Sequence, residues 1–394
     1  MEYTRSKVLG AGKTYVAISG LYIFIYYAFG ALYPLLSQYY KAMGLSGTQI
    51  GTISSVTPLI SIIAQPIWGM ICDKYQVRKP VLVGTMFAAA AISLLFTFVT
   101  SYAWILVLFL FVSLFQCAVV PITDSMALTY ANKQGMQFGN IRLWGAVGFA
   151  VAVFLTGLAV QAAGPDAIFY CYAAALMVSV LILRRIPDEG DSVNVRLFHG
   201  LGQLVKLPRF VLFLISSFFI FGAINANNIW FSLFYEHIGG TVAGIGLAFL
   251  LFAGSEAPFM KVSAYFVRRW GLELTILLAG AVSAVRWFWY SSAPDTTVIL
   301  LTFFIQGISV GFYLATAAQF VRDNTPASLQ VTALAIFASV GHGLGTMSCH
   351  FLAGLIMDQA GILNTYMFFG IFTVLGLIPL LVIRFGRLKK VSTG

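Results

Sequence analysis

The chain has 394 residues, a length that would ordinarily give two or three soluble domains. Its composition excludes that class, because 60% of the residues are apolar and 9% are charged, against about 25% charged in soluble proteins. The same apolar composition excludes a disordered chain. A nucleic-acid-binding protein is excluded too, since the 23 Lys and Arg residues lie between long apolar runs and do not form a folded basic domain. With a mean hydropathy of +0.90, the sequence predicts an all-α membrane protein surrounded by the lipid bilayer.

Twelve apolar runs are long enough to cross a bilayer, whose core of about 30 Å requires roughly 20 helical residues. We expect twelve transmembrane helices at 15–40, 48–72, 80–99, 103–130, 138–162, 167–184, 210–235, 242–266, 273–292, 296–321, 328–357 and 364–384. The least defined boundary is the turn around Ser101. The first run is longer than the apolar core of a signal peptide, about 7–15 residues, so we expect it to remain as a helix.

The cysteines do not indicate a metal site. They lie within or at the ends of the apolar runs, without the close spacing of metal ligands: Cys72, Cys117, Cys171 and Cys349. We expect free thiols, no metal and no other cofactor. The sequence also lacks the His-Glu-x-x-His and Gly-x-Ser-x-Gly motifs, so an enzyme is not predicted.

Basic residues gather on one side of the predicted helices. With the N-terminus inside, 20 of the 23 Lys and Arg residues fall in cytoplasmic segments, Lys41 falls outside, and Arg142 and Arg286 lie within helices. Basic residues near helix ends stay cytoplasmic. We therefore expect a multi-pass protein of the cell inner membrane with both termini in the cytoplasm.

The longest loop divides six predicted helices from six, and the two halves show a weak internal repeat. Gly30 recurs as Gly222, and Pro66 recurs as Pro258, at one offset of 192. We expect an N-terminal six-helix bundle over 1–184, a cytoplasmic linker loop over 185–209 and a pseudo-symmetric C-terminal six-helix bundle over 210–394. Parallel repeats of this kind are typical of transporters that rock around a binding site at mid-membrane, between the halves.

The segment between the second and third predicted helices resembles a signature of the major facilitator superfamily. It runs Gly69-Met70-Ile71-Cys72-Asp73-Lys74-Tyr75-Gln76-Val77-Arg78-Lys79, similar to the superfamily pattern of Gly, Asp-Arg/Lys, then Gly and basic residues. The resemblance covers essentially the whole chain and implies the major facilitator fold. It also implies a gating role for Gly69, Asp73, Lys74 and Arg78. The sequence departs from the pattern at Gln76, where Gly is usual, and at Val77.

A second stretch resembles the superfamily branch of phenylpropionate permeases, nucleoside:proton symporters and lactose permease. It reads Pro121-Ile122-Thr123-Asp124, followed by Gly139-Asn140-Ile141-Arg142-Leu143-Trp144-Gly145-Ala146-Val147-Gly148-Phe149. Lactose permease carries an acid on span four and an Arg on span five that hold sugar hydroxyls, with a Glu on span eight and an Arg on span nine. The matching residue types here are Asp124, Arg142, Glu256 and Arg286. The His and Glu of its span ten are absent, which argues against a galactoside.

These four charges at membrane depth would cost roughly 10–14 kcal/mol if unpaired, at about 2.5–3.5 kcal/mol each. We expect Asp124 to pair with Arg142 and Glu256 with Arg286, and Arg142 with Glu256 is an alternative. Such pairs either fix helix packing or mark a transport pathway. The Arg142 guanidinium suits a carboxylate or sugar hydroxyls. Glu256 is the candidate proton carrier, because burial and a nearby Arg act on a carboxyl group in opposite directions.

Further candidates for the site are polar or aromatic. His342 is a second candidate for proton coupling, because imidazole titrates near neutral pH, although a lone His among glycines is more often a packing residue. Resemblance to nucleoside symporters implies that Asn225 and Asn228 contact substrate. Trp144 and Phe149 can stack on a substrate ring, or face lipid.

The sequence predicts a secondary active transporter that couples protons to symport of a small organic solute by alternating access. The solute is a sugar, a nucleoside or an aromatic acid. The alternative is a proton-coupled exporter or an uncoupled facilitator of small organic molecules. Sodium coupling is disfavoured, because Asp124 with Thr123 is a thin ligand set. The expected partners are a small-molecule substrate and protons, with no nucleic acid, and we expect a monomer.

Overall fold

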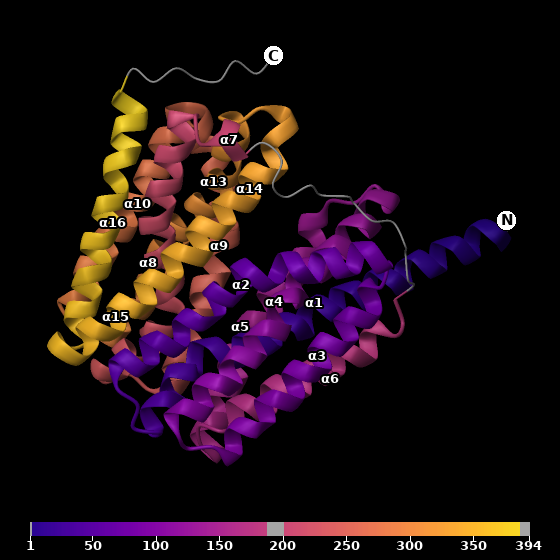
Figure 1. The fold of residues 1–394 in the computed structure, drawn as a ribbon, viewed down its shortest axis with the longest axis horizontal. Coiled ribbons are helices and arrows are strands. Elements are labelled where there is room, and N and C mark those ends of the chain that lie inside the picture. The colour runs from indigo at the N-terminus through magenta and orange to yellow at the C-terminus, as the bar shows by residue number, and fades with distance from the viewer. Residues whose placement is uncertain (1, 187–200, 387–394) are drawn as a thin grey trace. The chain divides into compact units, whose positions relative to one another are not determined.

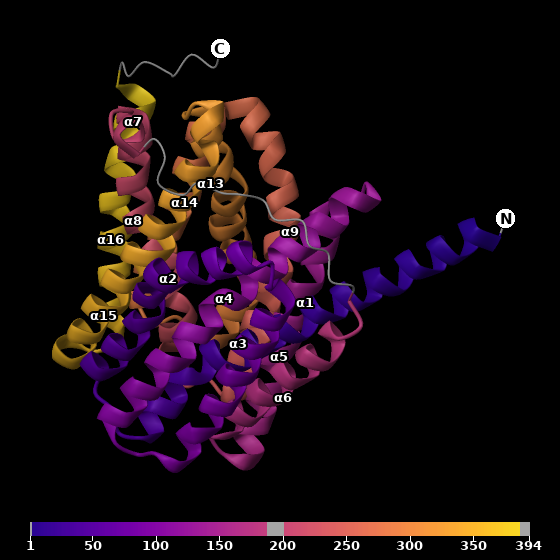
Figure 2. The ribbon, with the colours of Figure 1, turned by 45° about the vertical axis from the view of Figure 1, so that its right-hand side comes forward.

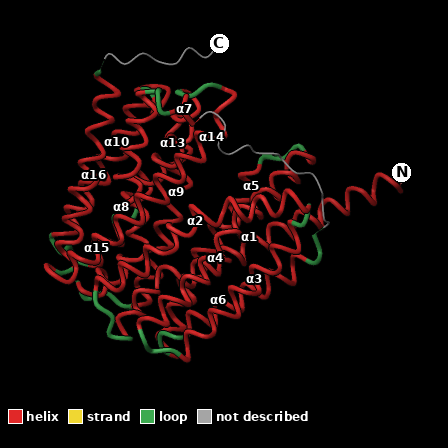
Figure 3. The backbone as a smooth tube through the Cα atoms, viewed as in Figure 1, coloured by secondary structure: helices red, strands yellow, loops and turns green. Residues whose placement is uncertain are grey.

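In a computed structural model, which describes residues 2–186 and 201–386, every secondary-structure element is a helix (Figure 3). Lipid offers no hydrogen-bond partners to the backbone, so each spanning segment must satisfy its own. The chain divides into two compact units, with 1–43 and 60–194 in unit 1 and 44–59 and 195–394 in unit 2. Residues 44–59 thus pack with unit 2, although they fall in the predicted N-terminal bundle. Most of the predicted linker, 187–200, lies outside the described residues.

The first six predicted spans each correspond to a helix. Their bounds are α1 Glu2–Ala42, α2 Gly47–Tyr75, α3 Arg78–Leu94, α4 Tyr102–Gln134, α5 Phe138–Ala163 and α6 Ala167–Leu183, with a short 3-10 helix, η1, at Leu95–Phe98. Within unit 1, α1 packs on α5 and α6, and α3 packs on α4 and α6 (Figure 1). The predicted turn around Ser101 is present, since η1 ends at Phe98 and α4 begins at Tyr102.

Glycines let α1 and α5 approach closely. A Cβ added at Gly30 would lie 2.5 Å from the carbonyl oxygen of Phe149, and one added at Gly148 would meet the backbone of Ile23. Small residues at such crossings are typical of membrane helices, which associate by close packing. The contact fixes the rotation of α5, and with it the direction of Arg142.

The second six spans are less regular. Their elements are α7 Leu201–Leu204, α8 Pro208–His237, α9 Val242–Trp270, α10 Leu272–Ser291, α11 Thr296–Leu301, α12 Phe304–Gln306, the π-helix η2 Gly307–Gly311, α13 Phe312–Asp323, the 3-10 helix η3 Ala327–Leu329, α14 Gln330–Ala338, the π-helix η4 Ser339–Gly345, α15 Thr346–Ala360 and α16 Ile362–Phe385. In unit 2, α16 packs against both α8 and α10, and α13 is a neighbour of α14 (Figures 1 and 2).

Unit 2 repeats the glycine contact of unit 1 between its own first and fifth spans. A Cβ at Gly222 on α8 would lie 2.6 Å from the carbonyl oxygen of Gly345, the last residue of η4. Gly222 is the repeat partner of Gly30, so in each unit the matched glycine lets the first span approach the backbone of the fifth.

Ten helices are long and apolar enough to cross a membrane among the residues described. The other two predicted spans correspond to α6, which has 17 residues, and to the run from α14 to α15, which η4 interrupts. The predicted all-helical membrane fold is confirmed.

Candidate transport site

Asp124 on α4 and Arg142 on α5 form the predicted ion pair of unit 1. Arg142 donates from Nη1 to Asp124 Oδ2 at 3.3 Å, and Tyr22 on α1 donates to Asp124 Oδ1 at 2.6 Å. Both carboxylate oxygens therefore accept a hydrogen bond. The side chain of Arg142 is 54% exposed and that of Asp124 is 25% exposed, so donor groups of the guanidinium remain available to a solute.

Aromatic rings surround this pair. Tyr22 and Tyr26 stack with ring centroids 6.0 Å apart. The Tyr26 ring also packs directly against Gly145, which has no side chain to keep it away. The Arg142 guanidinium lies 6.0 Å from the centre of the Phe138 ring. Charged and aromatic groups side by side suit a ring-shaped solute that carries hydroxyl groups.

The other two aromatic candidates on α5 lie in different directions. Phe149 is seven residues after Arg142 and therefore on the same side of the helix, and it is half-buried. Trp144 is 39% exposed and donates from Nε1 to the hydroxyl of Tyr15 at 3.4 Å. Phe149 can share a solute with Arg142 more readily than Trp144 can.

In unit 2 the expected pairing of Glu256 with Arg286 does not occur. Glu256 on α9 instead accepts a hydrogen bond from Gln306 Nε2 at 3.3 Å. Arg286 is 2% exposed, and none of its three guanidinium nitrogens has a hydrogen-bond partner within the described parts of the chain. The guanidinium lies over the Trp287 ring, 4.0 Å from its centre. A cation–π contact offsets part of the desolvation of Arg286.

Asn225 and His342 lie together. Asn225 on α8 is 3.4 Å from His342 Nδ1 on η4, and the His342 ring meets the Phe221 ring edge to face with centroids 4.0 Å apart. Asn228 is half-buried. The fully buried asparagine of this helix is Asn227, which accepts a hydrogen bond from the Tyr366 hydroxyl at 2.8 Å. No pattern in the sequence distinguishes the three asparagines of α8 from one another.

The predicted gating residues surround the end of α2. Asp73 pairs with Arg78 at 3.7 Å, while Lys74 lies 5.2 Å from the centre of the neighbouring Tyr75 ring. A Cβ added at Gly69 would meet open space. Gln76 follows the helix with φ +54°, the left-handed conformation that favours glycine, and its side chain donates to the Asp73 carbonyl. Gln76 thus adopts the backbone shape of the glycine usual at this place.

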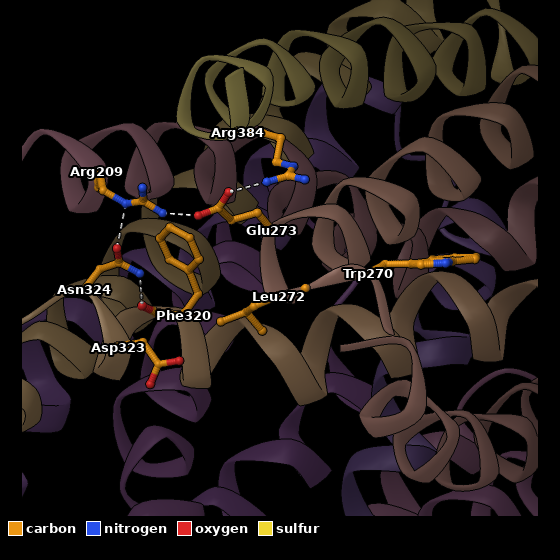
Figure 4. Close-up of a pocket in the computed structure, with 9 residues that line it drawn as sticks. Arg209, Trp270, Leu272, Glu273, Phe320, Asp323, Asn324 and Arg384 are labelled. Atoms are coloured by element: carbon orange, nitrogen blue, oxygen red, sulfur yellow. Dashed lines mark hydrogen bonds and ion pairs between the residues drawn. The ribbon is translucent and has the colours of Figure 1, made fainter. Parts of the chain in front are cut away.

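A charge cluster that sequence reasoning missed lies at one end of unit 2. Arg209 donates to Glu273 and, at 2.8 Å, to Asn324 Oδ1, and Arg384 lies 3.8 Å from the other Glu273 oxygen. Glu273 lies between the two arginines, beside a cavity of about 160 Å³ (Figure 4). The cluster ties together the ends of α8, α10, α13 and α16. Its members are far apart in sequence, so no local pattern reveals it.

A model described as the MFS_1 like family matches residues 15–368. The chain belongs to this family. It is a multi-pass membrane transporter of the major facilitator superfamily and not an enzyme, which confirms the resemblance found in the sequence.

Curated relatives match nearly the full length of the chain. A maltose permease of Geobacillus stearothermophilus is 38% identical over 379 residues, which covers 95% of each chain. The raffinose permease of Escherichia coli is 21% identical, covering 90% of this chain and 88% of its own. Among solved structures, the nucleoside transporter NupG matches with a TM-score of 0.84 at 16% identity, covering 94% of this chain and 99% of its own. That likeness shows the fold alone.

Proposed function

We propose that this transporter carries a sugar of the maltose type into the cell together with protons, by alternating access, with both termini in the cytoplasm. The identity of 38% to a maltose permease over 95% of both chains supports a sugar over a nucleoside or an aromatic acid. The observation that carries the proposal is the Asp124–Arg142 pair, because it offers both acceptor and donor groups at membrane depth while remaining partly exposed.

The pair can bind sugar hydroxyls in two ways at once. The remaining N–H groups of Arg142 donate to hydroxyl oxygens, and Asp124 accepts from hydroxyl groups. Hydrogen bonds to charged groups contribute about 1.5–3 kcal/mol each. Tyr22 holds Asp124 Oδ1, and the rings of Tyr26 and Phe149 provide apolar surface for the sugar ring.

Glu256 is the proposed proton carrier, and Gln306 supports both of its states. The hydrogen bond from the Gln306 amide N–H to Glu256 Oε1 suits an ionised carboxylate. A protonated Glu256 has a hydroxyl to donate, and Gln306 Oε1 is a buried acceptor without a partner among the described residues. Arg286, which is buried and has no hydrogen-bond partner in the described part of the chain, is a second partner that only the ionised form can take.

One proton per sugar is sufficient for accumulation. A single charge moving through about 100 mV supplies roughly 2.3 kcal/mol, which corresponds to about a fiftyfold gradient. Sequential occupation of sugar and proton sites then biases the carrier between its two conformations.

Proteoliposomes with an imposed pH gradient test the proposal. Labelled maltose should accumulate with proton influx, and a nucleoside and phenylpropionate serve as competing solutes. Movement of maltose that ignores the gradient, or efflux against it, would overturn symport and favour a facilitator or an exporter. Competition by the nucleoside but not by unlabelled maltose would overturn the sugar assignment.

A further inference from the structure

A row of aromatic rings follows one face of α1 away from the Asp124–Arg142 pair. The row consists of Tyr26, Phe29 and Tyr33, whose spacing of three and then four residues places them on one side of the helix. Ring centroids lie 6.1 Å apart between Tyr26 and Phe29 and 5.9 Å apart between Phe29 and Tyr33. All three side chains are half-buried, and Arg142 hydrogen-bonds to the Tyr26 hydroxyl at the start of the row. The aromatic row therefore extends the charged site along α1.

Gln116 on α4 faces this aromatic row. The two helices run in opposite directions, because the hydrogen bond to Asp124 comes from the middle of α1, whereas the Phe109 ring lies 6.4 Å from that of Tyr40, near the end of α1. Tyr33 lies seven residues, or two turns, before Tyr40. Gln116 lies seven residues after Phe109, so it reaches the level of Tyr33 and projects from α4 toward α1.

The side-chain amide of Gln116 is buried and unsatisfied. The residue is 4% exposed, and neither its amide nitrogen nor its carbonyl oxygen has a hydrogen-bond partner within residues 2–186 and 201–386. Burying an amide without partners is unfavourable, so such a group requires an explanation. The amide has two N–H donors and one acceptor oxygen. Neighbouring hydroxyl groups of a sugar both donate and accept, so they can satisfy both ends of this amide.

Neither α1 nor α4 has the other as its main neighbour. Within unit 1, α1 packs mainly on α5 and α6, and α4 packs mainly on α3. Beyond the hydrogen bond at Asp124, the two helices face each other through the half-buried aromatic row and the unsatisfied amide of Gln116. A solute held between them would meet an apolar surface on α1 and a polar group on α4.

The aromatic row is long enough for a disaccharide. An α-helix rises about 1.5 Å per residue, so Phe29 lies about 4.5 Å and Tyr33 about 10.5 Å beyond Tyr26 along the axis. A sugar ring beside Arg142 would therefore bring a second, linked ring over Phe29 and Tyr33. Sugar rings have apolar C–H faces that pack on aromatic rings, and their hydroxyl groups bind polar side chains.

We propose that Phe29, Tyr33 and Gln116 form a second subsite, which binds the second ring of a disaccharide whose first ring is held by the Asp124–Arg142 pair. The inference rests on the proposed function for the first ring. The two aromatic rings pack on the apolar face of the second sugar ring, and the Gln116 amide bonds two of its hydroxyl groups. The subsite selects disaccharides, because a monosaccharide bound to the charged pair gains nothing from these three residues.

Binding of maltose and methyl α-glucoside to the purified full-length carrier, compared by isothermal titration, tests the subsite. Gln116→Leu keeps a side chain of similar size and removes both ends of the amide. The Kd of maltose should rise about tenfold, because two neutral hydrogen bonds are lost, and that of methyl α-glucoside should stay the same. The unfolding temperature should be equal or higher, because an unsatisfied buried amide is gone. An equal loss for both sugars is expected of a packing residue and would overturn the proposal.

Replacement of the aromatic rings is an independent test with a matched control. Phe29→Leu and Tyr33→Leu should each raise the Kd of maltose about fivefold and leave that of methyl α-glucoside unchanged. Phe24 is another half-buried phenylalanine of α1, five residues before Phe29 and so about 140° around the helix from it. Phe24→Leu should change neither Kd. Weaker maltose binding by this control, equal to that of the two variants, would indicate a general loosening of α1 and contradict the subsite.

The same measurements separate failure of the subsite from failure of the proposed function. Binding needs no gradient, so an exporter or a facilitator gives the same result as a symporter. Wild-type maltose affinity in Gln116→Leu would overturn the subsite alone. Binding of sucrose in place of maltose, with the same selective loss in Gln116→Leu, would support the subsite and overturn the maltose assignment. A wild-type chain that binds no disaccharide, or binds both sugars equally well, would overturn the subsite.

Discussion

The two units hold similar charges in opposite ways. In unit 1, Asp124 and Arg142 are paired, and Tyr22 satisfies the remaining carboxylate oxygen. In unit 2, Glu256 is bonded to the neutral amide of Gln306, and Arg286 is buried with its guanidinium unsatisfied. A joined pair offers a fixed binding surface, whereas a separated pair can change partners. Under the proposed function, unit 1 recognises the solute and unit 2 carries the proton.

Glu256 and Arg286 lie at the same depth along their helices, so depth does not keep them apart. The rotation of α9 and α10 about their own axes does. Glu256 lies 14 residues before the end of α9 at Trp270, and Arg286 lies 14 residues after the start of α10 at Leu272, so both reach the same level. However, α9 packs against η2 and α12, which carries Gln306, while α10 packs mainly against α16. The two side chains therefore leave their helices in different directions.

The largest expected effect concerns stability, measured by thermal unfolding in detergent. Arg209→Met breaks a buried pair and leaves Glu273 with one partner fewer, so it should destabilise unit 2 by about 3–5 kcal/mol. Arg286→Met removes a buried charge that has no paired carboxylate among the described residues, so its unfolding temperature should be equal or higher. If both substitutions destabilised the protein equally, Arg286 would have a strong partner, and the contrast between the units would fail.

Sugar affinity should fall most when the Asp124–Arg142 pair is broken. Arg142→Ala removes charged hydrogen bonds of about 1.5–3 kcal/mol, so the dissociation constant should rise by up to about a hundredfold. Arg142→Lys keeps the charge but loses the planar fork, and it should recover only part of the affinity. Isothermal titration with maltose measures both, and wild-type affinity in Arg142→Ala would limit Arg142 to helix packing.

Sugar accumulation should be lost when Glu256 is replaced by a neutral residue. Glu256→Gln cannot exchange a proton, so the roughly fiftyfold gradient available from about 100 mV should collapse to equilibration. Sugar counterflow, which needs no net proton movement, should continue. Uptake and counterflow in the same proteoliposomes separate the two, and full accumulation by this variant would exclude Glu256 as the carrier.

The smallest effect is expected for the tyrosine that supports the joined pair. Tyr22→Phe removes the hydroxyl that donates to Asp124. This hydrogen bond acts on the sugar only by holding Asp124, so the loss of binding free energy should be about 1 kcal/mol, and sugar affinity should fall about fivefold. Tyr40→Phe is the matched control on the same helix, because the Tyr40 hydroxyl has no hydrogen-bond partner among the described residues. A larger loss in the control would show that the hydroxyl of Tyr22 is not the important group.

The fold was largely predictable from the sequence, and the site only in part. Apolar runs set the helix positions, since their length must match the bilayer, and the short turn at 135–137 between α4 and α5 keeps Asp124 and Arg142 on neighbouring helices. The rotation of α9 and α10 depends on glycine contacts such as Gly311 with the backbone of Glu256, which no local pattern encodes. For the same reason the Arg209 cluster, built from distant helices, was not foreseen.

The π-helical segments η2 and η4 lie inside spans that are otherwise mostly α-helical. An α-helix turns by about 100° per residue, so one inserted residue normally swings every later side chain onto another face. A π turn absorbs such an insertion locally. Spans ten and eleven therefore contain positions where chain length can change by one residue while side chains outside the π turn, such as Gln306 just before η2, keep their orientations. This gives related carriers a route to reshape this unit without rebuilding it.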